Sequence, residues 1–96
     1  MAEYALSNKA ENDLLRIARQ SLAQWGRAQA RRYIRGLHDQ FMRLAEFPDL
    51  GRDASGIRSG CLRIESGSHV ILYRKTTGGI RIVRVLHERM NLPRHL

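Results

Sequence analysis

The four histidines of this 96-residue chain are its best candidates for proton transfer or metal binding, because histidine changes charge close to neutral pH. They stand at positions 38, 69, 87 and 95, with no pair four residues apart and no carboxylate at metal-ligand spacing. The only cysteine, Cys61, has no second cysteine in the chain with which to form a disulfide or a thiolate metal site. The sequence therefore predicts no metal site and no cofactor.

His87 supplies the sharpest hypothesis for an enzyme. It precedes Glu88 and would share a sheet with side chains that bind phosphate or carry protons, namely Arg63, Tyr73, Arg74 and Arg84. Such a cluster could cleave RNA by general acid/base catalysis. We favour the alternative that the arginines solvate the sheet or bind an acidic partner, with His69 and His87 as hydrogen-bonded structural residues. No glycine-rich phosphate loop, nucleophile elbow or paired-carboxylate signature occurs.

The basic charge is concentrated in the C-terminal part of the chain. The formal net charge is +8, and residues 57–96 hold eight basic residues against two acidic ones. Fifteen of the seventeen basic residues are arginine, which makes bidentate contacts to carboxylates and phosphates. This composition indicates an acidic protein or a nucleic acid as partner, although a GC-rich genome produces the same bias. The predicted partner-binding residues are Arg63, Arg74, Arg84, His87, Met90 and Arg94.

Length and hydropathy favour one small cytoplasmic domain spanning residues 1–96. With 43% hydrophobic and 27% charged residues, the chain can build one modest core and keep a hydrated surface. Its longest apolar runs are far shorter than the roughly 20 residues that span a bilayer. The N-terminus has no basic start followed by an apolar stretch, which argues against a secretion signal.

Two helices are expected in the N-terminal half, after a short strand at residues 3–6. Asn8, with Glu11 three residues later, resembles a capping box, so the first helix should run from about 9 to 24 and end before Gly26. Its apolar stripe consists of Ala10, Leu14, Ile17, Ala18, Leu22 and Trp25. The second helix should run from about 28 to 46, before Pro48, on a stripe of Ala30, Tyr33, Ile34, Leu37, Phe41, Leu44 and Ala45. Met42 is a further core candidate. The short connection predicts an antiparallel helix hairpin over about 9–46.

The C-terminal half changes to a strand period. Residues 48–60 have the composition of a loop, and three apolar runs follow, separated by Ser66-Gly67 and Gly78-Gly79. Such pairs suit tight hairpin turns, so a β-meander over about 61–88 is expected, followed by a tail at 89–96. The predicted fold class is α+β: a short N-terminal strand and a helix hairpin packed on a three-stranded antiparallel sheet.

Five segments that together span nearly the whole chain are Trp25-Gly26-x-x-Gln29-Ala30-x-x-Tyr33, Pro48-x-Leu50-Gly51, Ile57-Arg58-x-Gly60, Gly67-Ser68-His69-Val70-x-x-Tyr73-Arg74, and Arg84-Val85-Leu86-His87-x-x-Met90 with His95-Leu96. In this order they resemble the ParE branch of the ParE/RelE toxin superfamily. The resemblance implies a RelE/ParE-like fold.

The resemblance also implies a function, that of the toxin of a type II toxin-antitoxin system of the kind that stabilises plasmids. Such a binding toxin inhibits DNA gyrase and forms a hetero-oligomer with a ParD-like antitoxin encoded alongside. The alternative is a ribosome-dependent mRNA endoribonuclease of the RelE type. That branch commonly places a tyrosine near the C-terminus, whereas here Glu88 follows His87 and no tyrosine lies beyond Tyr73. A third interpretation is an inactive toxin-like module that serves as half of a DNA-binding autoregulator.

Overall fold

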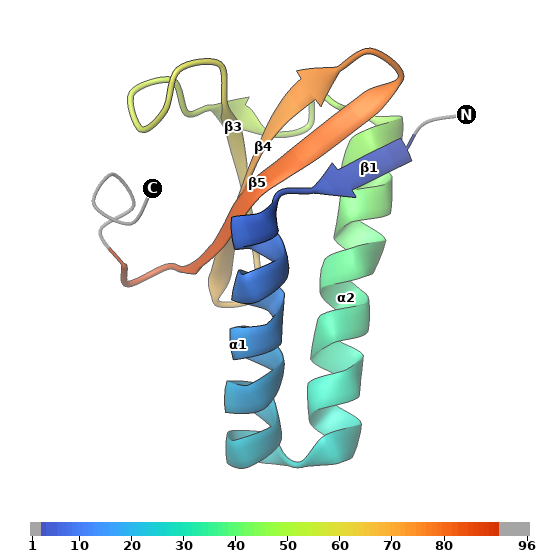
Figure 1. Cartoon of the computed structure of the whole chain (residues 1–96), viewed down its shortest axis with the longest axis vertical. Coiled ribbons are helices and arrows are strands. Elements are labelled where there is room, and N and C mark those ends of the chain that lie inside the picture. The colour runs from blue at the N-terminus through green and yellow to red at the C-terminus, as the bar shows by residue number, and fades with distance from the viewer. Residues whose placement is uncertain (1–2, 91–96) are drawn as a thin grey trace.

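The computed structural model describes residues 3–90, with two helices lying on a twisted sheet (Figure 1). The elements in chain order are β1 (Glu3–Leu6), α1 (Asn8–Trp25), α2 (Arg27–Glu46), β2 (Arg52–Asp53), β3 (Leu62–Ser66), β4 (His69–Thr76) and β5 (Gly79–His87). Residues 1–2 and 91–96 lie outside the described part, so the expectation for the tail is tested only at Arg89 and Met90.

The sheet has five strands in the order β1-β5-β4-β3-β2, so the predicted three-stranded antiparallel sheet was wrong in strand number and in strand direction. The meander β3-β4-β5 is antiparallel as expected. The strand β1 joins it in parallel along β5, from Glu3 opposite Gly79 to Leu6 opposite Ile82. The short β2, in the segment predicted as a loop, pairs with β3. Pairing between distant segments leaves no mark in a local hydrophobic period, so the sequence did not reveal it.

The helix hairpin begins one residue earlier than expected, because Ser7 and not Asn8 is the N-cap. Ser7 has an extended backbone, and its Oγ accepts the amide hydrogen of Ala10 at 3.0 Å. Gly26, with φ of 84°, ends α1 and directly precedes α2. A glycine reaches this left-handed backbone conformation without steric cost, which allows a one-residue reversal between the helices.

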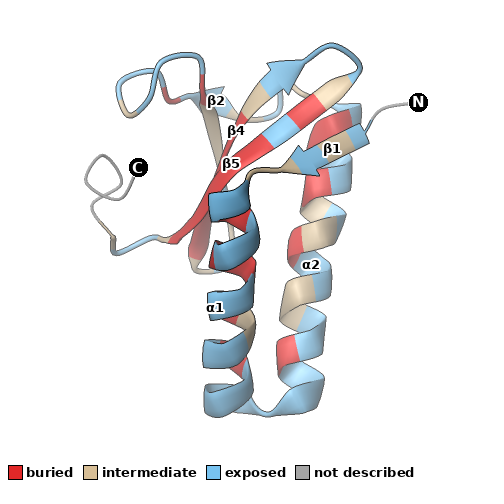
Figure 2. Cartoon of the chain, in the orientation of Figure 1, coloured by how far each residue is buried: buried red, intermediate tan, exposed pale blue. Residues whose placement is uncertain are grey.

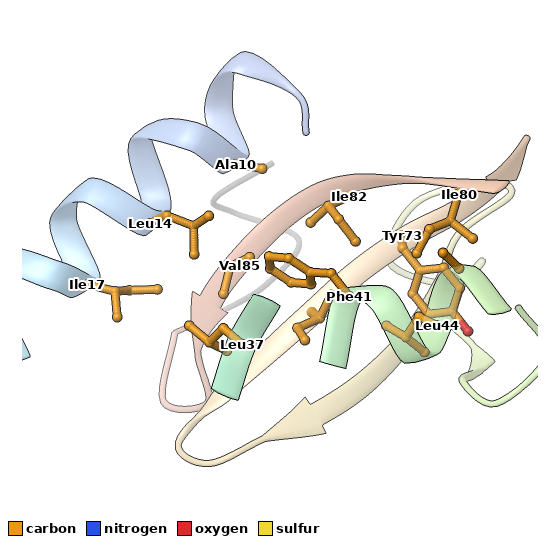
Figure 3. Close-up of a cluster of buried hydrophobic side chains, with 12 residues drawn as sticks. Ala10, Leu14, Ile17, Leu37, Phe41, Leu44, Tyr73, Ile80, Ile82 and Val85 are labelled. Carbon is orange, nitrogen blue, oxygen red and sulfur yellow. The ribbon is translucent and has the colours of Figure 1, made fainter. Parts of the chain in front are cut away.

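The main core lies between the helices and one face of the sheet. Phe41 and Leu44 of α2 are fully buried there against Tyr73 of β4 and Ile82 of β5 (Figure 3).

Met42, predicted as a core residue, is 61% exposed, because each helical residue is turned by about 100° from the one before. Two other members of the predicted stripe, Leu22 and Trp25, are also exposed. They lie toward the hairpin tip, which projects past the sheet (Figure 2).

A second, smaller apolar cluster covers the opposite face of the sheet. The segment after β2 folds over this face and buries Ala54 and Cys61 against Leu72 and Val83. Tyr73 fixes the start of this segment from the other side, because its hydroxyl donates to the carbonyl of Pro48 at 2.7 Å and accepts the amide of Gly51 at 2.8 Å. The face that lacks helices is therefore covered in part and is not a bare sheet.

No helix within residues 3–90 is both long enough and apolar enough to cross a membrane. Over the same residues, no group of three or more histidine, cysteine, aspartate or glutamate side chains is placed to hold a metal ion.

Candidate functional site

The structure does not gather the predicted partner-binding residues on one surface. Arg63 on β3 has a side chain only 25% exposed, and its Nε lies 3.8 Å from Oε2 of Glu65. Arg74 on β4 lies opposite Arg81, and its Nη2 donates to the carbonyl of Ser59 at 3.1 Å. Met90 packs beside Val70 and Leu86. Arg94 lies outside the described residues.

Arg84 was predicted on an open sheet face, but it is buried. Its Nε and Nη2 donate to the two carboxylate oxygens of Asp13 on α1, at 2.8 and 2.9 Å. The hydrogen bonds to Asp13 raise the pKa of Arg84, against the opposing effect of burial. Oδ2 of Asp13 also accepts the backbone amide of Val85 at 2.9 Å. The pair therefore fastens α1 to β5.

A second polar contact fixes the start of α1 on the same strand. The Ser7 amide donates to the carbonyl of Ile82 at 3.0 Å, and Ser7 Oγ donates to the carbonyl of Val83 at 2.7 Å. Together with the Asp13–Val85 bond, these contacts satisfy backbone groups of β5 beyond the point where β1 ends at Leu6. Ser7 and Asp13 at the start of α1 thus form hydrogen bonds with the backbone of β5 that an edge strand would otherwise form.

His87, the predicted acid/base residue, lies in a cluster that sequence reasoning did not foresee. Its ring lies 5.4 Å from that of His69, measured between centroids, and the two rings are nearly perpendicular. The hydroxyl of Tyr33 on α2 lies 2.6 Å from Nδ1 of His69 and accepts the amide of Ser68 at 3.2 Å. A tyrosine therefore contacts His69, the histidine next to His87, although it comes from the helix hairpin and not from the C-terminal part of the chain.

The environment of His69 indicates a structural role. Only 8% of the residue is exposed, and burial lowers its pKa, with smaller contributions from the positive charges of His87 and Arg16. Negative charge on Glu88 and Asp13 acts in the opposite direction. Burial therefore disfavours the charged form of His69, and the ring is hydrogen-bonded to Tyr33, as expected of a hydrogen-bonded structural histidine.

The helix hairpin carries an apolar groove that points to a protein partner. The groove has a volume of about 580 Å³ and is lined by residues of α1 and α2. Its apolar lining is Ala18, Leu22, Ala30 and Ile34, and its polar lining is Arg27, Arg31, Arg35 and His38. Leu22 is 52% exposed although its residue type favours burial. An apolar floor beside three arginines suits an amphipathic segment with acidic residues at its edges.

The signals that could have located these features were present but ambiguous. Asp13 interrupts the apolar stripe of α1 between Ala10 and Ile17, and a charged residue on a buried face implies a buried partner. The arginines at 27, 31 and 35 recur every four residues, so they share one side of α2 beside Ala30 and Ile34. Neither pattern identifies the binding partner. The partner of Asp13 comes from a distant element, and that of the arginines would come from another molecule.

Comparisons with known proteins agree with this architecture. A family described as the ParE toxin of the type II toxin-antitoxin system parDE matches residues 4–92. Toxin ParE1 of Caulobacter vibrioides is 42% identical, over 100% of this chain and 99% of its own length. Toxin ParE1 of Mycobacterium tuberculosis is 40% identical, over 99% and 98% of the two lengths.

A solved structure shows the same fold in a toxin-antitoxin system. It is described as the chromosomal ParDE TA system from P. aeruginosa, and it superposes with a TM-score of 0.76 at 19% identity, covering 91% of this chain and 96% of that one. At this identity the likeness establishes the α+β fold alone. The full-length matches in sequence establish the family, whose members are binding toxins and not enzymes. The chain belongs to the ParE toxin family of type II toxin-antitoxin systems.

Proposed function

We propose that residues 1–96 act in the cytoplasm as one toxin domain that inhibits DNA gyrase and is neutralised by a ParD-like antitoxin encoded alongside. The antitoxin and the toxin would form a hetero-oligomer, and the pair would stabilise the plasmid or chromosomal region that encodes it. The family match over residues 4–92 supports the toxin role. The gyrase target is inferred from the family alone.

The observation that carries the antitoxin part of the proposal is the apolar groove of the helix hairpin. Leu22 is half exposed at the groove, with arginines 27, 31 and 35 beside it. A disordered acidic segment of the antitoxin would fold onto this groove, burying its apolar side chains against Leu22 and Ile34 while its carboxylates meet the arginines. Burial of the toxin's exposed apolar surface supplies most of the affinity, and the charges guide the approach.

The structure offers little support for the ribonuclease alternative, which the family match also does not favour. Among the described residues, the His–Tyr pair near His87 is formed by His69 and Tyr33. The hydroxyl of Tyr33 and Nδ1 of His69 are already hydrogen-bonded to each other. With only 8% of the residue exposed, His69 has little access to a substrate, whereas His87 is half-buried. A catalytic general base must reach the proton that it removes, and His69 does not meet this condition.

Expression of the toxin without antitoxin tests the target. We expect growth arrest with a rise in DNA-damage signalling, purified gyrase trapped on cleaved DNA, and intact ribosome-bound messages. A His87→Ala variant that remains folded should arrest growth as the wild type does, because no acid/base step is needed. General acid/base catalysis contributes about 10² to 10⁴ in rate, so a ribonuclease should lose most of its activity in this variant. Messages cut within minutes, without damage signalling and with growth restored by His87→Ala, would refute the gyrase proposal.

A further inference from the structure

A hollow of about 280 Å³ lies at the opposite end of α1 from the hairpin tip, where β1 passes into α1 beside β5. It is formed by four segments that are far apart in the sequence. Its lining residues are Ser7, Asn8, Lys9, Arg58, Arg74, Arg81 and Val83. From Asn8 to Leu22 the helix rises by roughly 21 Å, so this hollow and the hairpin groove are separate surfaces.

The hollow is strongly cationic. Four of its lining residues, Lys9, Arg58, Arg74 and Arg81, carry a positive charge, and no aspartate or glutamate lines it. None of the ion pairs found within residues 3–90 involves any of the four. Cations gathered from four segments without a neutralising carboxylate create a local positive potential that attracts an anion.

Two of these arginines are direct neighbours on adjacent strands. Arg74 on β4 and Arg81 on β5 are direct cross-strand partners. Like charges in this position destabilise a sheet, so the pairing opposes folding unless an anion lies between them. Arg74 is also held in place, because its Nη2 donates to the carbonyl of Ser59, and its buried Nε has no hydrogen-bond acceptor within the described residues. The bond to Ser59 thus holds the charged guanidinium of Arg74 at the wall of the hollow.

The N-terminus of α1 adds to the same potential. Asn8 and Lys9 are the first two residues of this 18-residue helix, and both line the hollow. The end of a helix carries partial positive charge from its unpaired amides, which favours phosphate groups. The side chain of Ser7 satisfies the amide of Ala10 and its carbonyl that of Glu11, so the amides of the first two residues remain for a ligand.

We propose that this hollow binds a phosphodiester group of a nucleic-acid strand. Arginine, lysine and helix amides match the oxygens of a phosphate, and the volume suits a single group of that size. An acidic peptide segment is the weaker fit, because such segments gain affinity from apolar contacts and Val83 is the only large apolar residue in the lining. The inference concerns a second surface and does not depend on gyrase being the target.

Fluorescence anisotropy with a labelled 15-nucleotide single strand, as DNA and as RNA of equal sequence, tests the proposal. The site variant is Lys9→Gln with Arg81→Gln, two exposed residues outside every described ion pair. The control is Arg19→Gln with Arg32→Gln, which removes the same charge from exposed positions on the hairpin. At 100 mM salt we expect the site variant to bind about tenfold more weakly, with a salt slope lower by about 1, and the control to change less than threefold.

Equal losses in the two variants would show that only the net charge matters and would overturn the proposal. No loss in the site variant would overturn it as well. A poly-glutamate peptide serves as competitor, and binding to it tighter than to either oligonucleotide, lost in the site variant alone, would assign the hollow to an acidic protein instead. If either oligonucleotide binds more tightly than the peptide, with the loss confined to the site variant, the proposal stands. The strand that binds better, DNA or RNA, then identifies the source of the phosphate. Unchanged thermal transitions establish that each variant is folded.

Discussion

Asp13 and Arg84 lie 71 residues apart in the chain and form a buried two-point contact, with Nε to Oδ2 at 2.8 Å and Nη2 to Oδ1 at 2.9 Å. The same carboxylate accepts the amide of Val85. One aspartate on α1 thus satisfies both a buried cation and a backbone donor of β5, and it sets where the helix hairpin lies along the sheet.

Asp13→Asn should destabilise the protein strongly, because it leaves the charge of Arg84 buried without its counter-charge. Removing one partner of a buried pair costs about 3–5 kcal/mol, a large share of the roughly 5–15 kcal/mol that stabilises a small domain. The free energy of unfolding from urea titration checks this expectation. The matched control is Arg16→Gln, which removes the other ion-pair partner of Asp13, a side chain 44% exposed. A control change below about 1 kcal/mol is expected, and equal effects would disprove the special role of Arg84.

Leu22→Asp should weaken antitoxin binding at least tenfold without unfolding the toxin. The side chain is half exposed, so the folded state tolerates a charge there, whereas a bound acidic segment would lose an apolar contact and meet a like charge. Co-purification with the ParD-like antitoxin through a single tag at about 0.5 M salt checks this, because salt at that level screens exposed charge pairs and leaves apolar contacts.

Met42→Asp is the control for the groove, since Met42 is an equally apolar and 61% exposed residue that does not line it. We expect this variant and the wild type to retain the antitoxin under the same conditions. Loss of the antitoxin from both variants, or from neither, would contradict the placement of the antitoxin in the groove. Complete dissociation of the wild-type pair at high salt would show that apolar contact contributes little.

The stability of the domain should fall as the pH drops below about 6.5, the ordinary pKa of histidine, on account of His69. Burial lowers the pKa of His69 in the folded state, so below 6.5 the unfolded chain takes up a proton that the folded chain does not. The contribution is fully present above the unfolded pKa and is lost as the pH falls through the folded one.

Urea midpoints at pH 7.5 and pH 5 measure this dependence in the wild type and in His69→Gln, which keeps a polar partner for the hydroxyl of Tyr33. The variant should lose less stability than the wild type between the two pH values. If the urea midpoints of wild type and variant differ by the same amount at pH 7.5 and at pH 5, His69 is ruled out as the titrating group.

Deletion of residues 91–96 should leave the fold intact and reduce function. The core residues that pack between helices and sheet all lie at or before position 85, so the truncated chain keeps a cooperative thermal transition. The family-like ending His95-Leu96 suggests that the tail meets the antitoxin or the target. Loss of the thermal transition on truncation would make the tail structural, and unchanged toxicity and antitoxin binding would remove its functional role.

The sequence by itself determined the elements whose signals are local. The stripes of α1 and α2, the glycine at position 26 and the proline at 48 predicted both helices to within a residue or two, and the alternation after residue 61 predicted the meander. These features depend on neighbours three or four residues away, or on the pleat of a single strand. The family followed from short segments in register, for the same reason.

Only the tertiary structure decided the contacts that join distant segments. The parallel pairing of β1 with β5, the Asp13–Arg84 pair and the approach of Tyr33 to His69 all link residues more than thirty positions apart. The hairpin groove and the cationic hollow likewise arise where separate elements meet. A linear pattern records which face of an element is buried, whereas the partner of a buried charge depends on how the elements pack, since many distant side chains would satisfy the same local pattern.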